Sequence, residues 1–273
     1  YSERRLFQLR RMRRKETIMK TVKVKEVEIG RGIPKICIPI TGTTREEILL
    51  DVEEILKQKP DLAEWRADCY KEGENGEKVL EMLKTITDRL GQIPLLFTFR
   101  TAKEGGSRQI SFEDYVKLLN LAAAAGLTDL VDVEVFFQKT STPKLVKQLQ
   151  DQGVKVVASN HHFEGTPSRT ELVEILENLR ESGADILKMA VMPKNFQDLL
   201  RLMEVTQEGR EKYERPLITM SMGKIGFLSR ICGEITGSAV TFAAGRNASA
   251  PGQGGAEPMR NILNSIHEIL KDT

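Results

Sequence analysis

The sequence of 273 residues has no apolar run that approaches the roughly 18 residues needed to cross a membrane as a helix. It has only three cysteines, Cys37, Cys69 and Cys232, which are far apart and lack CxxC spacing. This usage is typical of reduced thiols and speaks against disulfides or a zinc site. Three histidines, two of them adjacent, are too few for a metal cluster to be expected. We therefore expect a soluble cytoplasmic protein that binds no metal.

A general excess of positive charge is also missing, because the surplus basic residues lie at the start of the chain. Residues 1–20 contain eight Lys or Arg and two Glu, whereas the remaining 253 residues carry 33 basic and 37 acidic side chains. The body of the chain therefore has no charge pattern typical of nucleic-acid binding. We expect residues 20–273 to form one folded domain, preceded by a basic leader over residues 1–19.

Three interpretations of this leader are open. It is a disordered tail upstream of a natural start at Met19, a segment added for expression, or an organelle-targeting peptide, since it is rich in Arg and poor in acid. The first two are favoured, because the leader lacks an apolar h-region and Met19 directly precedes a clean strand pattern.

Beyond residue 20, short β-rich runs alternate with amphipathic helical runs. In the helical runs apolar residues recur at a spacing that places them on one face, as at Ile48, Val52 and Ile55. Ser168 and Glu171 have the spacing of a helix-starting capping box. The eight β-rich runs are residues 35–40, 62–68, 94–100, 130–135, 155–163, 184–191, 216–222 and 239–245.

A strand and a helix repeated about every 30 residues predict βαβ units and a parallel sheet. Eight such units fit a closed (β/α)8 TIM barrel. A doubly wound open sheet is the rival, but the turns after the strands lack a GxGxxG fingerprint or a P-loop. The alternating stretch at 21–29, with Gly30 and Gly32, predicts a β-hairpin that closes the N-terminal end of the barrel.

Charged and polar residues gather where the predicted strands end, which is where barrel enzymes place their active sites. Glu64, Arg66 and Asp68 would share one face of a strand, because side chains alternate with period two. Unpaired ions there would be costly, so the sequence predicts either a polar site or an internal salt-bridge network. The other such residues are Arg100, Glu104, Asp132, Glu134, His161, His162, Lys188, Arg230 and the stretch 249–253.

Lys188 has apolar neighbours on both sides in the run ADILKMAV. Burial disfavours the ammonium form and frees the amine to attack a carbonyl, as a Schiff-base lysine must. The alternatives are a lysine that reaches out to solvent at the strand end or one that pairs with a carboxylate. His161 and His162 are candidate general acid–base residues. Strand alternation points one of them inward but does not say which.

Six motifs in order resemble type I 3-dehydroquinate dehydratases, from about residue 20 to the C-terminus. They are EWRAD (64–68), TFRTAKEGG (98–106), SNHHF (159–163), ADILKMAV (184–191), SMGKIGFLSR (221–230) and SAPGQ (249–253). The resemblance implies a (β/α)8 barrel, assembled as a homodimer, that converts 3-dehydroquinate to 3-dehydroshikimate plus water. This step of the shikimate pathway of aromatic amino acid biosynthesis would use imine catalysis and no cofactor.

The resemblance also implies roles for individual residues. Lys188 matches the Schiff-base lysine, His161 the general acid–base, and Glu104 a glutamate that orients and tunes that histidine. The implied substrate-binding residues are Glu64, Arg66 and Arg100 for the ring hydroxyls, Arg230 for the carboxylate, and Ser249 and Gln253 on a loop that closes over the substrate. Asn160 stands where the family usually has Tyr, and His162 where it has Asp or Asn.

Two other functions are considered. A Schiff-base aldolase would need the same kinds of residue but typically handles phosphorylated sugars, whereas Arg230 and the SAPGQ loop suit a carboxylate better. A barrel that serves only as a binding scaffold would be expected to have lost motif positions, and here all of them are filled. We therefore expect an enzyme with a small-molecule substrate, without a nucleic-acid or membrane partner.

Overall fold

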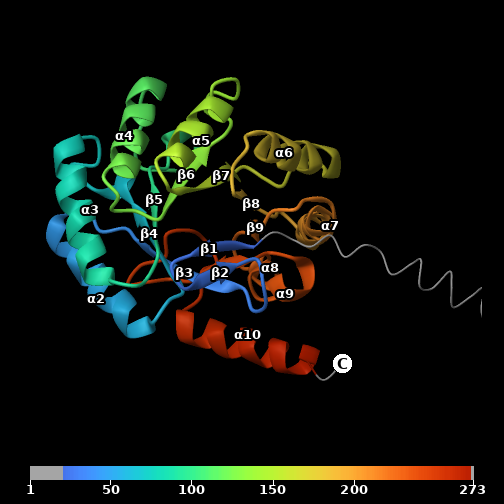
Figure 1. Ribbon diagram of the computed structural model, residues 1–273. Helices are drawn as coiled ribbons and strands as arrows, with labels where there is room; N and C mark the ends of the chain where they lie inside the picture. The colour runs from blue at the N-terminus through green and yellow to red at the C-terminus, as the bar shows by residue number, and fades with distance from the viewer. Residues whose placement is uncertain (1–20, 272–273) are drawn as a thin grey trace, which may run out of the picture.

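The computed structural model describes residues 21–271, so the leader expected over residues 1–19 lies outside the described residues. Eight strands run through the centre and helices surround them (Figure 1). The strands are β3 (Lys35–Ile40), β4 (Leu62–Arg66), β5 (Leu95–Thr98), β6 (Leu130–Glu134), β7 (Lys155–His162), β8 (Ile186–Val191), β9 (Leu217–Ser221) and β10 (Val240–Phe242). Each lies within one of the eight β-rich runs of the sequence.

The eight strands form one parallel sheet in the order β10-β3-β4-β5-β6-β7-β8-β9. Its two edges meet, because Leu217 and Ser238 form a parallel bridge and the Ala239 amide donates to the Leu217 carbonyl over 2.7 Å. The sheet therefore closes on itself. The prediction of a (β/α)8 barrel is confirmed, and the rival doubly wound sheet is wrong.

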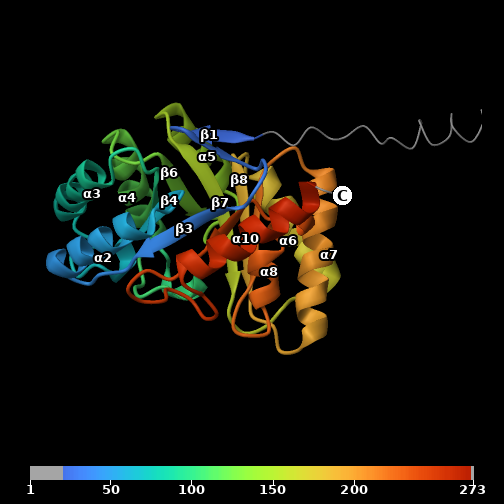
Figure 2. The ribbon, with the colours of Figure 1, turned by 90° about the horizontal axis from the view of Figure 1, so that it is seen from below.

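Helices follow the strands and cover the outside of the barrel. Ile48, Val52 and Ile55 are buried, and Ser168 and Glu171 form the predicted capping box. The helices are α2 (Arg45–Gln58), α3 (Gly76–Leu90), α4 (Phe112–Ala124), α5 (Thr142–Asp151), α6 (Arg169–Glu181), α7 (Phe196–Lys212), α8 (Phe227–Ile231), α9 (Gly233–Thr236) and α10 (Ala256–Lys271), with the 3-10 helices η1 (Ala67–Cys69) and η2 (Ala102–Glu104). Figure 2 shows α10 beside β3 and α8, which it contacts.

The predicted hairpin is present as β1 (Val22–Val24) and β2 (Val27–Ile29), which pair antiparallel. The chain reverses at Lys25, which has a φ of 50°, and not at Gly30 or Gly32. Val22, Val24 and Ile29 pack against apolar residues at the starts of the barrel strands. The hairpin therefore closes the N-terminal end of the barrel, as expected.

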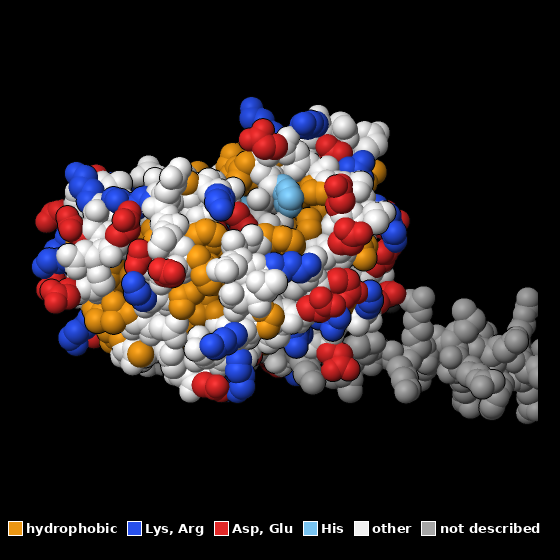
Figure 3. Space-filling view, turned by 90° about the horizontal axis from the view of Figure 1, so that it is seen from above, with side chains coloured by type: hydrophobic (Ala, Val, Ile, Leu, Met, Phe, Trp, Pro, Cys, Tyr) orange, Lys and Arg blue, Asp and Glu red, His pale blue; other side chains and the backbone are white. Residues whose placement is uncertain are grey.

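On the face shown in Figure 3, Lys and Arg side chains are interspersed with Asp and Glu. Within residues 21–271, no helix is long and apolar enough to cross a membrane.

We expect the hairpin to contribute to stability through Ile29, whose side chain is buried in the barrel end. Ile29→Ala should lower the free energy of unfolding by about 2–5 kcal/mol, because it removes buried methyl groups and leaves a cavity. Lys23→Ala, on the same hairpin but with a side chain 67% exposed, should change it by less than about 0.5 kcal/mol. Urea unfolding followed by circular dichroism measures both, and equal effects would show that the hairpin does not support the barrel.

Candidate active site

Strand alternation builds a polar layer inside the barrel on top of an apolar one. On five neighbouring strands an inward apolar residue is followed two positions later by an inward polar residue. These pairs are Leu62 and Glu64, Leu96 and Thr98, Leu130 and Asp132, Val157 and Ser159, and Ile186 and Lys188. The apolar members pack with the hairpin at the N-terminal end. The polar members therefore face the C-terminal end, where barrel enzymes carry their sites.

Lys188 is 3% exposed and its ammonium group has two carboxylate partners. Nζ lies 3.3 Å from Glu64 Oε1 and 3.5 Å from Asp132 Oδ2. It also lies 4.6 Å from the centre of the Phe242 ring, within the range of a cation–π contact. Of the alternatives that the sequence left open, pairing with carboxylates describes these contacts and reaching out to solvent does not.

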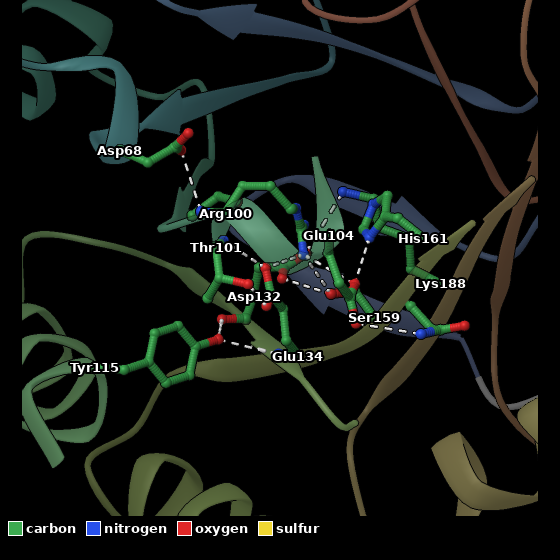
Figure 4. A network of polar contacts seen from close by, with 12 residues as sticks. Asp68, Arg100, Thr101, Glu104, Tyr115, Asp132, Glu134, Ser159, His161 and Lys188 are labelled. Atoms are coloured by element: carbon green, nitrogen blue, oxygen red, sulfur yellow. Dashed lines mark hydrogen bonds and ion pairs between the residues drawn. The ribbon is translucent and has the colours of Figure 1, made fainter. Parts of the chain in front are cut away.

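Arg100 joins several strands of the barrel from within, as Figure 4 shows. Its Nη2 lies 2.9 Å from Asp132 Oδ2, and its Nη1 lies 2.9 Å from both Glu134 Oε1 and Ser159 Oγ. Burial by itself would raise the pKa of Asp132, but Arg100 and Lys188 hold that pKa below its usual range. The salt-bridge network that the sequence left open is therefore present, in the same place as the polar site.

His161 and Glu104 form a buried pair. His161 Nδ1 lies 2.8 Å from Glu104 Oε2. Burial, followed by the positive charges of Arg100 and Lys188, lowers the pKa of His161 well below its usual value. The imidazole is therefore neutral at neutral pH, as a general base must be. Burial, followed by repulsion from Glu134, raises the pKa of Glu104 to about 8.

The direction in which the β7 side chains alternate shows which of the two histidines faces the inside of the barrel. Ser159 points into the barrel, where it bonds Arg100, and so His161 two residues later also points inward. His162 points the other way, is only half buried, and has no hydrogen bond with Glu104 among the described contacts. The geometry thus brings His161, and not His162, into the polar layer.

Asp68 does not share a strand face with Arg66, contrary to the sequence prediction. β4 ends at Arg66, and Asp68 lies on the 3-10 helix η1, where period-two alternation no longer applies. Its carboxylate instead turns back to accept two hydrogen bonds from Arg66, at 2.8 and 2.9 Å. It also accepts from the backbone amides of Arg100 and Ser107. Asp68 thereby holds the side chain of Arg66 and the backbone of Arg100.

Arg230, on α8, is a buried cation without an ion pair among the described residues. Its Nη2 donates to the Pro251 carbonyl over 3.1 Å, whereas its Nε has no partner among the described atoms. Burial lowers the pKa of this guanidinium to about 10. A buried cation that lacks a counter-charge is a ready partner for an anion.

The loop that holds Pro251 is closed by its own side chains. The Ser249 amide donates to Gln253 Oε1 over 2.8 Å, and Gln253 Nε2 donates to Ser249 Oγ over 2.9 Å. A cavity of about 80 Å³ lies beneath this loop. Its lining includes eight of the nine site residues expected from the sequence, namely Glu64, Arg66, Arg100, Glu104, His161, Lys188, Ser249 and Gln253. Arg230 lies outside this lining.

Comparison with known proteins agrees with this geometry. The family model for type I 3-dehydroquinase matches residues 36–270. The chain belongs to the type I 3-dehydroquinase family. It is therefore an enzyme, a hydro-lyase, and this decides against a scaffold without catalysis.

Individual relatives match over nearly their whole length. The chain is 46% identical to the 3-dehydroquinate dehydratase of Syntrophotalea carbinolica over 251 residues, covering 91% of this chain and 99% of the relative. It is 42% identical to the solved type I enzyme from Clostridium difficile with covalently modified comenic acid, with a TM-score of 0.88, covering 91% and 98%. The 3-dehydroquinate dehydratase structure from Geobacillus kaustophilus is 36% identical, with a TM-score of 0.89, covering 93% and 98%.

Other residues support this dehydroquinase-family site without having been singled out in the sequence. Ser159 donates to Asp132 Oδ1 over 2.6 Å, and Thr98 donates to Glu64 Oε1 over 3.0 Å. Both occupy inward positions, which strand alternation could have indicated. Tyr115 reaches in from α4 and accepts from the Glu134 amide over 3.0 Å. No pattern along the chain could have indicated a contact from a helix outside the barrel.

We expect Glu104 to lower the stability of this dehydroquinase-family barrel as the pH rises. Its folded-state pKa of about 8 lies above that of an unfolded glutamate, so the folded state binds the extra proton between these values and the free energy of unfolding falls as the pH rises. Between pH 5 and pH 8, the free energy of unfolding of Glu104→Gln should therefore rise by about 3 kcal/mol relative to that of the wild type, because the variant has no such proton to lose. Urea unfolding at the two pH values measures this.

Glu113→Gln, which changes an exposed glutamate on α4, is the matched control and should keep the wild-type pH dependence. If Glu104→Gln showed the wild-type dependence as well, the carboxyl group would not be held protonated in the folded state.

Proposed function

We propose that the chain is a dehydratase that converts 3-dehydroquinate to 3-dehydroshikimate and water through an imine on Lys188. The observation that carries this proposal is that a buried lysine and a neutral histidine line the same cavity. The names of the relatives, 3-dehydroquinate dehydratases, support the choice of substrate. Homodimer assembly and a cytoplasmic location stay predictions from the sequence.

The first step forms the imine. The Lys188 ammonium releases one proton, and the resulting amine attacks the C3 carbonyl of the substrate. The carbonyl oxygen leaves as water, taking up that proton and a second one from the nitrogen. The product is an iminium, which is positively charged like the ammonium it replaces. Glu64 and Asp132, which lie 3.3 and 3.5 Å from Nζ, can therefore stabilise the intermediate by the contacts that hold the free lysine.

The second step removes a proton. The iminium withdraws electrons, so the C2 proton becomes acidic enough for a neutral imidazole to take. An ionised Glu104, 2.8 Å from His161 Nδ1, accepts a hydrogen bond from Nδ1–H and leaves the Nε2 lone pair free to act as the base. The resulting enamine expels the C1 hydroxyl, and the imidazolium protonates it as water leaves. Hydrolysis of the imine uses one water and returns the free lysine.

The remaining residues bind and enclose the substrate. Arg230 is a buried guanidinium without an ion pair among the described residues, and so it can bind the substrate carboxylate with paired N–H donors. Arg66 lines the cavity near Lys188 and can donate to ring hydroxyls. The Ser249–Gln253 loop covers a cavity of about 80 Å³ and must open to admit a six-membered ring. Once closed, it would keep bulk water from hydrolysing the imine early.

We expect borohydride to trap the substrate on Lys188. Reduction in the presence of 3-dehydroquinate should add the mass of the reduced adduct to the peptide that contains Lys188, as read by peptide mass mapping. Lys188→Ala should not be trapped and should lose its activity, because no other amine replaces the nucleophile.

Lys194→Ala, which changes an exposed lysine shortly after β8, is the matched control and should be trapped and active. Label on another lysine, or an active Lys188→Ala variant, would exclude the imine mechanism at this position.

The two histidines should separate imine formation from turnover. His161→Ala should still form the trapped imine, but its kcat should fall by about 10²–10⁴-fold because the general acid–base is lost. His162→Ala should retain most of its activity, since His162 points away from the polar layer. Steady-state kinetics combined with borohydride trapping measures both. The opposite pattern would assign proton transfer to His162.

A further inference from the structure

Asn160 makes a contact with the Glu104–His161 pair that the mechanism above does not use. It lies on β7 and is 6% exposed. Its Nδ2 donates to Glu104 Oε1 over 3.1 Å, while the other oxygen of the same carboxylate contacts His161 Nδ1. The Asn160 carbonyl oxygen is buried and has no partner among the described atoms. Among the described side chains, the Asn160 amide group therefore forms a hydrogen bond with Glu104 alone.

Asn160 reaches Glu104 from the side that faces away from Lys188. Glu104 and His161 line both the cavity around Lys188 and a second cavity of about 440 Å³. Lys188 lines only the first cavity, and Asn160 lines only the second. The pair thus lies between the two cavities, and Figure 4 shows Glu104 and His161 within the polar network. Asn160 would not touch a substrate bound to Lys188, so any effect on the reaction must pass through Glu104.

The charge on Glu104 is finely balanced. Glu134 and Asp132, both on β6, disfavour its ionised form, whereas Arg100, 3.7 Å away, favours it. His161 on β7 is neutral near pH 7 because its pKa is lowered. Burial and these charges together raise the pKa of Glu104 to about 8, although the hydrogen bond from Asn160 acts to lower it. One hydrogen-bond donor can therefore change how much of the carboxyl group is ionised at working pH.

The protonation state of Glu104 decides which nitrogen of His161 can act as a base. An ionised Glu104 accepts from Nδ1–H, and the lone pair then lies on Nε2. A protonated Glu104 donates to Nδ1 instead, and the ring proton then moves to Nε2, where it blocks the base. A donor to the carboxylate on its far side favours the first state, because hydrogen bonds to ionised groups are the stronger ones.

We propose that Asn160 is a positioning residue that stabilises the ionised form of Glu104 through its hydrogen bond and so favours the His161 tautomer that removes the substrate proton. This inference rests on the function proposed above for His161. It assigns Asn160 a role in the reaction without contact with the substrate.

The dependence of kcat/KM on pH tests the proposal. Asn160→Leu keeps the approximate size of the side chain but removes the donor, so Glu104 should hold its proton to higher pH. The acid limb of kcat/KM should move up by about one pH unit. Below the limb the variant should therefore have about a tenfold lower kcat/KM than the wild type, and above the limb nearly the same value. Asn160→Ala is a second variant without the donor, and Asn160→Gln, which keeps an amide, should restore much of the wild-type profile.

His162→Leu is the matched control on the same strand, since His162 has no hydrogen bond with Glu104 among the described contacts. Its acid limb should stay at the wild-type pH. An equal loss of kcat/KM at every pH in both donor-free variants would overturn the proposal, because it would indicate a structural role alone.

The nitrogen-15 chemical shifts of the His161 ring provide a readout that needs no substrate. In the wild type near the acid limb they should report the proton on Nδ1, and in Asn160→Leu at the same pH they should shift toward the proton on Nε2. Unchanged shifts would contradict the role of Asn160. Failure of the wild type to convert 3-dehydroquinate would instead contradict the proposed function, whatever the shifts show.

Discussion

The ion pairs of the Arg100 guanidinium are the interaction on which the inside of this barrel depends. Asp132 and Glu134 lie within 2.9 Å of it and Glu104 within 3.7 Å. Taking one ion out of water costs several kcal/mol, and only close partners of opposite charge offset that cost. Without Arg100, Glu104 and Glu134 would be two buried carboxylates with no cation near either among the described ion pairs. The polar layer depends on this cation because it joins three of the carboxylates.

The same network prepares the interior for chemistry. A lysine that is held by two carboxylates already has around it the negative charge that an iminium needs, so little rearrangement accompanies imine formation. Arg100 and Lys188 also keep His161 neutral after burial has lowered its pKa. Stability and reactivity thus draw on the same contacts. Glu104 has a raised pKa, so its ionised form, which leaves Nε2 of His161 free as the base, lowers the stability of the fold.

Strand periodicity explains why the sequence could indicate so much of the site. Apolar and polar residues alternate within each strand, and each polar residue at a strand end could be recognised from its immediate neighbours. The alternation predicted that His161 and His162 face opposite ways. It could not predict which of the two faces the inside of the barrel, because both faces of a barrel strand are covered and both accept apolar residues. The contact of Ser159 with Arg100 shows that Ser159, and with it His161, faces inward.

Elsewhere local patterns were insufficient or misleading. The sequence pattern predicted that Asp68 continues the side-chain alternation of β4, but the strand ends before Asp68, which lies on η1. Arg230 follows β9 in the chain, yet only the folded structure shows that it is buried without an ion pair among the described residues. Tyr115 contacts the site from outside the sheet. Each of these depends on where separate elements meet, which a pattern within one element does not contain.

The sequence by itself determined the alternation of strands and helices, and with it the barrel, because apolar periodicity and helix caps act over a few neighbouring residues. It also indicated which polar residues would lie at or just beyond the strand ends. Only the tertiary structure decided which charges meet. Lys188 contacts Glu64, 124 residues away, and Asp132, 56 residues away. Such contacts form only when the sheet closes, since closure brings distant strands to the same small interior.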